Sequence, residues 1–217
     1  FWPIPASQKD TGIVRLHPRI LHSLAGITFL LLTPSAGGAE DLYAGIAGAQ
    51  SDFETDISVR KGATLDSKSS AGYLFIGREF DNGKSAEGFY ANLGKTRIIG
   101  KADATLSTAG STYRFRKNAT ATASVKTFGV AGKYHFDLHA RTRLSAKFGV
   151  HSWKRRTSLT GTAANIDVKD DGVDAMAGLG IEFAATDKLA LMFGHDNFAI
   201  DDDSVAVSYL GLKLKFD

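Results

Sequence analysis

Two short clusters of cationic side chains are the residues in this sequence best suited to hold a ligand. Each adjoins an aromatic residue, Phe115 in the first cluster and Trp153 in the second. Arginine and lysine bind phosphate groups through charge-assisted hydrogen bonds, so these clusters could bind a phosphorylated surface. Charges that are merely solvated in loops would give the same pattern, and the sequence leaves both interpretations open. The clusters are Arg114, Arg116 and Lys117, and Lys154, Arg155 and Arg156.

The composition excludes several other kinds of site. The 217 residues contain no cysteine, so neither a disulfide nor a Cys-ligated metal site can form, and we expect no cofactor. The chain has 26 basic and 23 acidic residues, of which residues 1–39 hold three and one. The remainder is therefore close to neutral and gives no electrostatic support for a nucleic-acid partner. All four prolines lie before residue 40, which favours sheet beyond it, because proline cannot donate to a strand ladder.

The first 39 residues are expected to direct export and not to join the fold. Arg15 and Arg19 precede an apolar run, Ile20–Leu32, which is followed by small residues up to Ala39. The run is shorter than the roughly 20 residues of a membrane-spanning helix. We therefore predict a secretory signal peptide cleaved after Ala39, with residues 1–14 upstream of the true start, and a folded domain over 40–217. A buried or anchoring helix is the alternative.

The body of the chain alternates with a period of two, which is typical of β-strands. In the last segment Leu210, Leu212 and Leu214 share one face with Phe216, and small, polar or cationic residues occupy the other. The same pattern predicts eight strands and no helix. The predicted strands are 41–53, 71–80, 88–99, 127–136, 141–153, 172–184, 189–200 and 205–216.

The connections between these strands alternate in length. Asn82-Gly83 predicts a tight hairpin, whereas 54–69, 100–124 and 154–171 are polar and are predicted to be long loops. In 100–124, extension of the strands on either side is the alternative. Strands of 10–13 residues suit a tilted membrane crossing better than the shorter strands of soluble sheets.

One face of these strands is apolar and the other carries glycines and ionisable groups. An outer-membrane barrel would turn the apolar face to lipid, whereas a soluble lipocalin-like barrel would line a ligand pocket with it. Strand length, the signal peptide and the glycines favour the membrane. We hypothesise that Glu182 and Asp196 neutralise buried lysines, since an unpaired buried charge is costly; charges that reach water at the barrel mouths are the alternative. The predicted interior charges are Lys133, Lys147, Glu182, Asp196, Lys213 and Lys215.

Residues 40–217 resemble the OmpA-type and OmpX-type eight-stranded outer-membrane barrels. The resemblance rests on Tyr90–Gly94 (YANLG), Gly178–Phe183 (GLGIEF) and the closing segment Tyr209–Phe216, although Asp217 follows the terminal aromatic residue. It implies an all-β, antiparallel up-and-down transmembrane barrel in the bacterial outer membrane. Eight strands leave room for little more than their own side chains, so we expect no open pore.

Some outer-membrane barrels are lipid A deacylases, which use a His and a Ser two residues apart. Asn197 takes the place of that Ser after His195, and Ser152 follows His151 directly, so neither spacing fits. We therefore expect no enzyme.

The sequence predicts a monomeric outer-membrane barrel with a structural or surface-interaction role. Both cationic clusters would lie at its outer end, where lipopolysaccharide phosphates are found. Two alternatives remain: an adhesion or immune-evasion factor that acts through its external loops on a host or surface ligand, and a soluble periplasmic lipid-binding barrel.

Overall fold

The computed structural model describes residues 42–60, 62–80, 83–108, 111–161 and 166–216. The predicted signal peptide and its cleavage site lie outside these residues. In the described part of the chain, no helix has the length and apolar character that a membrane crossing requires.

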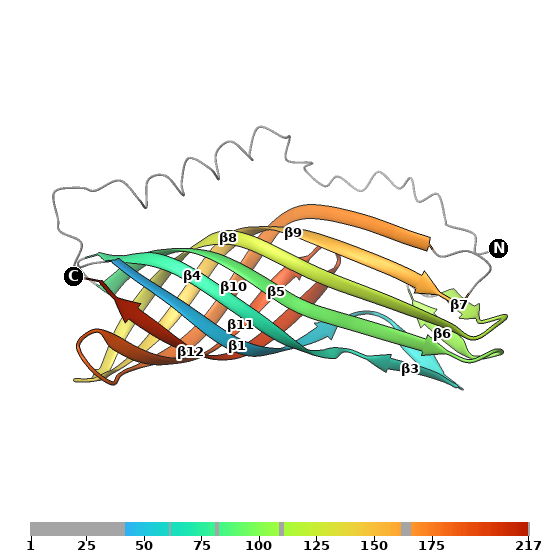
Figure 1. Ribbon diagram of the computed structural model, residues 1–217, viewed down its shortest axis with the longest axis horizontal. Coiled ribbons are helices and arrows are strands. Elements are labelled where there is room, and N and C mark those ends of the chain that lie inside the picture. The colour runs from blue at the N-terminus through green and yellow to red at the C-terminus, as the bar shows by residue number, and fades with distance from the viewer. Residues whose placement is uncertain (1–41, 61, 81–82, 109–110, 162–165, 217) are drawn as a thin grey trace.

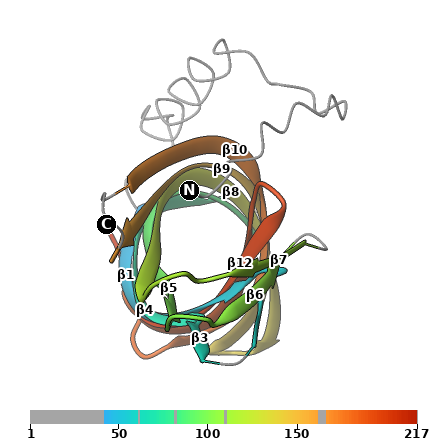
Figure 2. The ribbon, with the colours of Figure 1, turned by 90° about the vertical axis from the view of Figure 1, so that its right-hand side faces the viewer.

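Eight antiparallel strands form a closed barrel, which confirms the predicted fold (Figures 1 and 2). Each barrel strand pairs with the barrel strands before and after it in the sequence, and the first pairs with the last, which closes the barrel. The barrel strands are β1 (Leu42–Glu54), β4 (Lys68–Phe80), β5 (Lys84–Gly100), β8 (Ala119–His139), β9 (Thr142–Thr160), β10 (Ile166–Ala184), β11 (Leu189–Ile200) and β12 (Asp203–Lys215).

The two ends of the barrel differ. At the turn end, short connections join β4 to β5, β8 to β9 and β10 to β11, and the C-terminus lies nearby (Figure 1). The strands β5, β8, β9 and β10 are 17 to 21 residues long and extend further at the other end, the extended end, whereas β1, β4, β11 and β12 have 12 or 13 residues. One wall of the barrel therefore projects beyond the other.

Three predicted long loops are largely strand. The segment 54–69 contains β2 (Ser58–Arg60) and β3 (Ala63–Asp66), and 100–124 contains β6 (Thr105–Thr108), β7 (Ser111–Arg114) and the start of β8. In 154–171, β9 continues to Thr160 and β10 begins at Ile166. The prediction of loops was wrong for these strand residues, whereas the extension of a flanking strand into 100–124 is confirmed for β8. Ser, Thr, Ala and charged residues occupy both faces there, so the alternation that reveals a half-apolar strand is lost.

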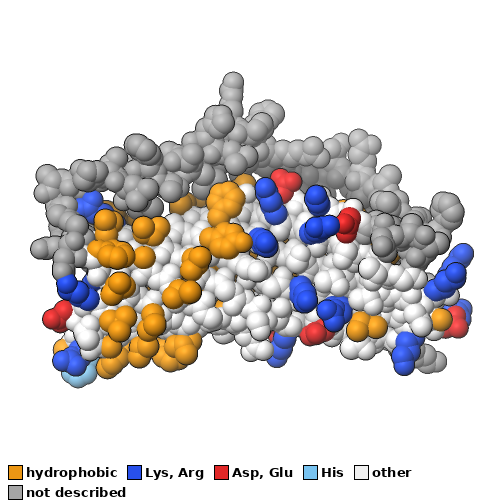
Figure 3. All heavy atoms as spheres, in the orientation of Figure 1, with side chains coloured by type: hydrophobic (Ala, Val, Ile, Leu, Met, Phe, Trp, Pro, Cys, Tyr) orange, Lys and Arg blue, Asp and Glu red, His pale blue; other side chains and the backbone are white. Residues whose placement is uncertain are grey.

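Apolar side chains cover the outside of the barrel near the turn end (Figure 3). On β8, Phe128, Tyr134, Phe136 and Leu138 all point outward and are 44–61% exposed. From Phe128 to Leu138 the strand rises about 33 Å, or about 25 Å along the barrel axis at a tilt of about 40°. That is the height of the apolar band of a transmembrane barrel. The lipocalin-like alternative requires these side chains to point inward and is not favoured.

A β-bulge on β5 sets which side chains face outward above this band. The register with β8 shifts between Asn92 and Lys95, and Gly94 lies in the shift with φ +79°. Leu93 points inward and is fully buried, and Lys95 points outward beyond it. Glycine accommodates a φ that other residues adopt only with strain, so the bulge depends on Gly94.

Candidate functional site

The inside of the barrel near the turn end holds a cluster of five charged side chains. We call Glu79, Arg143, Glu182, Lys213 and Lys215 the terminal cluster. Arg143 Nη2 lies 2.8 Å from Glu79 Oε1 and 3.1 Å from Glu182 Oε2, while Lys215 Nζ lies 2.7 Å from Glu79 Oε2. Lys213 contacts Glu79 at 2.9 Å and also pairs with Glu182. Two carboxylates thus bind three cations.

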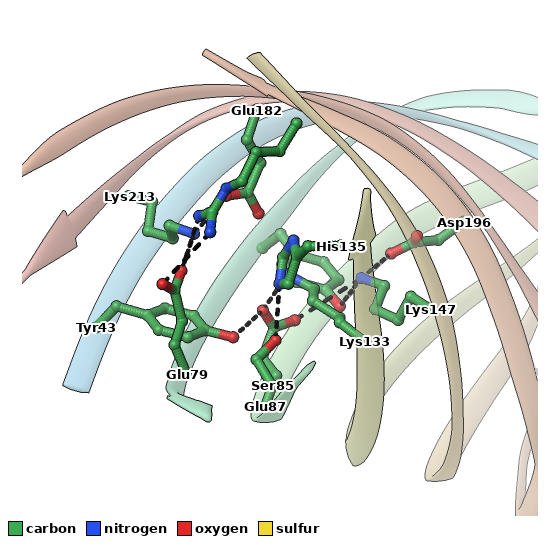
Figure 4. A network of polar contacts seen from close by, with 12 residues as sticks. Tyr43, Glu79, Ser85, Glu87, Lys133, His135, Lys147, Glu182, Asp196 and Lys213 are labelled. Atoms are coloured by element: carbon green, nitrogen blue, oxygen red, sulfur yellow. Dashed lines mark hydrogen bonds and ion pairs between the residues drawn. The ribbon is translucent and has the colours of Figure 1, made fainter. Parts of the chain in front are cut away.

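A second group lies further along the barrel axis (Figure 4). We call Glu87, Lys133, Lys147 and Asp196 the central cluster. Lys133 pairs with Glu87, which also accepts a hydrogen bond from Tyr43 Oη at 3.3 Å. Lys147 Nζ lies 2.5 Å from Asp196 Oδ2 and 3.8 Å from Glu87 Oε1. These four side chains are at most 3% exposed, so their charges are compensated inside the barrel and not by water.

Aromatic rings fill the space around the lysines. The ring of Tyr73 stacks on Phe89 and Tyr209 with centroids 5.5 and 5.7 Å away. Lys147 Nζ lies 4.9 Å from the centroid of Tyr73, and its ammonium group donates to Tyr73 Oη at 3.0 Å. The rings therefore add cation–π contacts to the ion pairs.

Glycines on the inner face make this packing possible. A Cβ on Gly194 would lie 2.2 Å from the Tyr209 ring, and a Cβ on Gly178 would lie 1.9 Å from Asp196 Oδ1. A side chain at either position would displace a member of the network or its supporting ring.

An apolar layer separates the central cluster from the extended end. Its side chains are at most 2% exposed. The layer consists of Leu93, Val125, Phe198, Ile200, Val205 and Val207.

The structure places the six predicted interior charges on the inner face. Lys133, Lys147, Glu182, Asp196 and Lys213 are buried, and Lys215 lies near the turn end with its side chain one-third exposed. The partners differ in part from the hypothesis, because Lys133 pairs with Glu87 and Lys215 with Glu79. Sequence reasoning missed both glutamates, because Glu79 lies in a predicted strand whose two faces are both mixed and Glu87 precedes the predicted strand 88–99.

The six predicted phosphate-binding cations do not form one site. Lys154 and Arg156 lie on β9 and point outward, whereas Arg155 between them points into the barrel. The loop placement of all three was wrong, because β9 continues through them. Arg114 ends β7 and pairs with Asp103 at 2.8 Å, and Arg116 and Lys117 follow it, exposed, at the extended end.

Outward-facing cations form a band just beyond the apolar surface (Figure 3). Lys126 and Lys154 are directly opposite each other on β8 and β9, and both are exposed. Ser124 lies between Lys95 and Arg156 in the next row of side chains, and Arg156 faces Lys169 on β10. Two carboxylates of β10 adjoin these cations: Asp167 pairs with Arg156 at 2.6 Å, and Asp171 lies opposite Lys154. We call Lys95, Lys126, Lys154, Arg156 and Lys169 the basic belt.

The chain belongs to the family described as "Outer membrane protein beta-barrel domain", whose model matches residues 23–216. No curated protein matches it. Among solved structures it is similar to Ail, the attachment invasion locus protein of Yersinia pestis. That structure has a TM-score of 0.52 and 18% identity, with 82% of this chain and 99% of that chain covered. A second Ail structure, in complex with the heparin analogue sucrose octasulfate, gives 0.52 and 14%, with 81% and 98% covered.

This family and this fold place the protein in the bacterial outer membrane, as a barrel with a structural or surface-interaction role. The turn end is accordingly the periplasmic end, and the extended end is the outer end.

Proposed function

We propose that this protein is a monomeric, non-catalytic barrel that is held in the outer leaflet by lipopolysaccharide, whose phosphates bind the basic belt. Its projecting wall presents a surface outside the cell. Export through a signal peptide in residues 1–39 is part of this proposal, as is the lack of an open pore.

The opposition of Lys126 and Lys154 supports this function more than any other observation. Like charges directly opposite each other on neighbouring strands destabilise a sheet. Among the described residues neither lysine has a carboxylate within ion-pair distance, although Asp171 on β10 lies opposite Lys154 on its other side, so Lys126 is the less compensated of the two. A phosphate between the two ammonium groups would convert the repulsion into two charge-assisted contacts.

The depth of the belt matches the position of lipid headgroups. Tyr90 and Phe128 are paired across β5 and β8, are 43% and 45% exposed, and lie at the outer edge of the apolar band. Aromatic side chains concentrate at such interfaces in transmembrane barrels. Lys126 lies two residues before Phe128, about 7 Å further along the strand toward the outer end, which brings its ammonium group to headgroup level.

Lipopolysaccharide binding can be tested by co-purification from outer membranes. The double variant Lys126→Gln/Lys154→Gln should retain several-fold less lipopolysaccharide per folded barrel than the wild type. A matched control, Lys84→Gln/Arg141→Gln, removes two exposed cations near the periplasmic end and should retain the wild-type amount. Equal retention by all three proteins would remove the belt as a binding site.

The exposed cations at the outer tip favour a second candidate function, adhesion to an anionic surface ligand. Arg114, Arg116 and Lys117 project beyond the belt, and Ail, which shares the fold, has been captured with a sulfated heparin analogue. If this chain binds such glycans, neutralising these three residues will abolish retention on immobilised heparin and leave lipopolysaccharide content unchanged. The belt variant would show the opposite pattern.

The surroundings of His195 support a non-catalytic role. His195 Nδ1 lies 2.9 Å from Ser208 Oγ on the outward face, a Ser–His pair that the sequence spacing did not reveal. No carboxylate contacts His195 in the described part of the chain, so the base lacks the orienting group that serine nucleophiles use. Ser208→Ala should therefore leave the acyl composition of the surrounding lipid unchanged.

A further inference from the structure

A cavity of about 220 Å³ lies in the outer mouth of the barrel, and the proposed function makes no use of it. Its floor includes Val125, Ile200 and Val205, which are 1–2% exposed and belong to the apolar layer. The layer separates the cavity from the central cluster, so a molecule that enters from outside meets a closed end.

The cavity is mostly apolar. Phe53, Ile57 and Ile98 contribute to its wall together with alanines of β8. Thr55 also lines it, and its Oγ1 atom is buried without a hydrogen-bond partner in the described residues. A buried hydroxyl without a partner costs free energy, which a bound donor or acceptor would recover.

The charged side chains at the cavity are unbalanced. Arg155 Nε lies 3.4 Å from Asp170 Oδ2, and Arg155 Nη1 lies 3.3 Å from Asp203 Oδ2. Its remaining nitrogen, Nη2, lies 3.8 Å from Asp201 Oδ2. One guanidinium group therefore serves three carboxylates, two of which, Asp170 and Asp203, line the cavity.

No other cation in the described residues compensates these carboxylates. Asp56 and Asp202 also lie close enough to Asp203 to act on its charge, and both are acidic. Arg155 also forms a cation–π contact with Trp153, whose ring centroid lies 5.5 Å from the guanidinium carbon. The mouth thus combines an apolar chamber with a surplus of negative charge.

We propose that this cavity binds a small organic cation with an apolar body, whose ammonium group lies beside Asp170 and Asp203 while its hydrocarbon part packs on Val125 and Val205. The volume suits a ligand of roughly ten heavy atoms, below the usual range for drug-sized molecules. The site is distinct from the basic belt, which faces outward on the other side of the same wall.

Other ligand classes fit less well. An anion would meet surplus carboxylates, and a neutral apolar molecule would leave their charge uncompensated. A metal ion would find few ligands among the apolar walls, and the described residues contain no group of three or more His, Cys, Asp or Glu arranged to hold one.

Calorimetric titration of the full chain in phosphatidylcholine nanodiscs tests the proposal, with empty nanodiscs as the blank. Phenethylammonium, 2-phenylethanol and 3-phenylpropionate share an apolar ring and differ in charge. We expect saturable 1:1 binding of the ammonium, at least tenfold weaker binding of the alcohol and no binding of the carboxylate. Equal affinity for ammonium and alcohol, or no saturable binding of the ammonium to folded barrel, would overturn the proposal.

Two kinds of variant locate the site. Asp170→Asn/Asp203→Asn should weaken phenethylammonium binding at least tenfold, whereas Asp167→Asn, which removes an outward carboxylate paired with Arg156, should leave it unchanged. Ala123→Leu fills the cavity and should abolish binding, while Ala146→Leu adds the same group on the outward face as its control. Wild-type affinity in folded Ala123→Leu would place the ligand elsewhere and refute the site. None of these outcomes depends on lipopolysaccharide binding.

Discussion

The two halves of the barrel differ in how completely their charged side chains are paired. Among the described residues, every cation of the terminal and central clusters has a carboxylate partner, and the two clusters together contain five cations and four carboxylates. At the outer end, Lys126 faces Lys154, and three carboxylates share Arg155. A low-dielectric interior cannot hold unpaired charge, whereas a water-facing surface can. Balanced charge therefore supports the fold, and unbalanced charge marks where an external partner can bind.

The largest loss of stability should come from removing a carboxylate of the interior ion-pair network. Glu182→Ala leaves Lys213 and Arg143 with Glu79 as their one shared carboxylate among the described contacts. Removing one partner of a buried ion pair typically costs about 3–5 kcal/mol, so the barrel should lose its heat-resistant gel mobility at a much lower temperature. Asp187→Ala, in the exposed β10–β11 turn, is the control and should change nothing. An unchanged midpoint for Glu182→Ala would contradict a structural role for the network.

The next largest loss of stability should come from adding a side chain to the inner-face glycines that leave room for the charged network. Gly194→Ala places a methyl group against the ring of Tyr209, which is itself stacked on Tyr73. Overpacking of this kind costs about 1–3 kcal/mol. Gly132→Ala is the matched control, because nothing lies within 4 Å of its added Cβ on the outward face. Unfolding in urea should separate the two variants; similar midpoints would mean that the inner face tolerates the extra volume.

Removing a like-charge contact at the outer end should raise the stability of the barrel, whereas the two preceding changes lower it. In detergent free of lipopolysaccharide, Lys126→Gln should raise the free energy of unfolding by about 0.2–1 kcal/mol, because a like-charge cross-strand pair is lost while Lys154 keeps Asp171 opposite it on β10. Urea titration measures this directly. A loss of stability would show that the two lysines are already compensated within the chain.

The smallest effect concerns Asp203. Burial raises the pKa of this carboxyl, and the neighbouring Asp56, Asp201 and Asp202 act in the same direction, although Arg155 opposes them. The folded state therefore binds more protons than the unfolded state between the two pKa values, and this carboxyl contributes stability that increases as pH falls through its folded pKa. Wild type should gain stability relative to Asp203→Asn between pH 7 and pH 4. A flat difference across that range would contradict the raised pKa.

The fold was predictable because the membrane imposes alternation. Between Phe128 and Phe136, each outward residue is apolar, aromatic or glycine while Lys133 and His135 turn inward, so face and strand could be assigned together. Beyond the apolar band both faces meet water, the constraint disappears, and β6, β7 and the ends of β9 and β10 were taken for loops.

The candidate sites were harder to predict, since a pairing depends on register between strands distant in sequence. Lys133 and Glu87 are separated by 46 residues and meet because β5 lies beside β8. Successive side chains of a strand point to opposite faces. If residues 154–160 had been recognised as strand, this alternation would have placed Arg155 on one face and Lys154 and Arg156 on the other. The opposition of Lys126 and Lys154 requires the β8–β9 register, which no short motif encodes.

The most direct test of this account is the change in thermal midpoint that lipopolysaccharide produces, followed by heat-modified gel mobility, in wild type and in Lys126→Gln/Lys154→Gln. Lipopolysaccharide should raise the midpoint of the wild type, because it binds the folded barrel through the belt, and the variant should lose most of that increase. An equal increase in both proteins would show that the unbalanced outer charge does not hold the lipid.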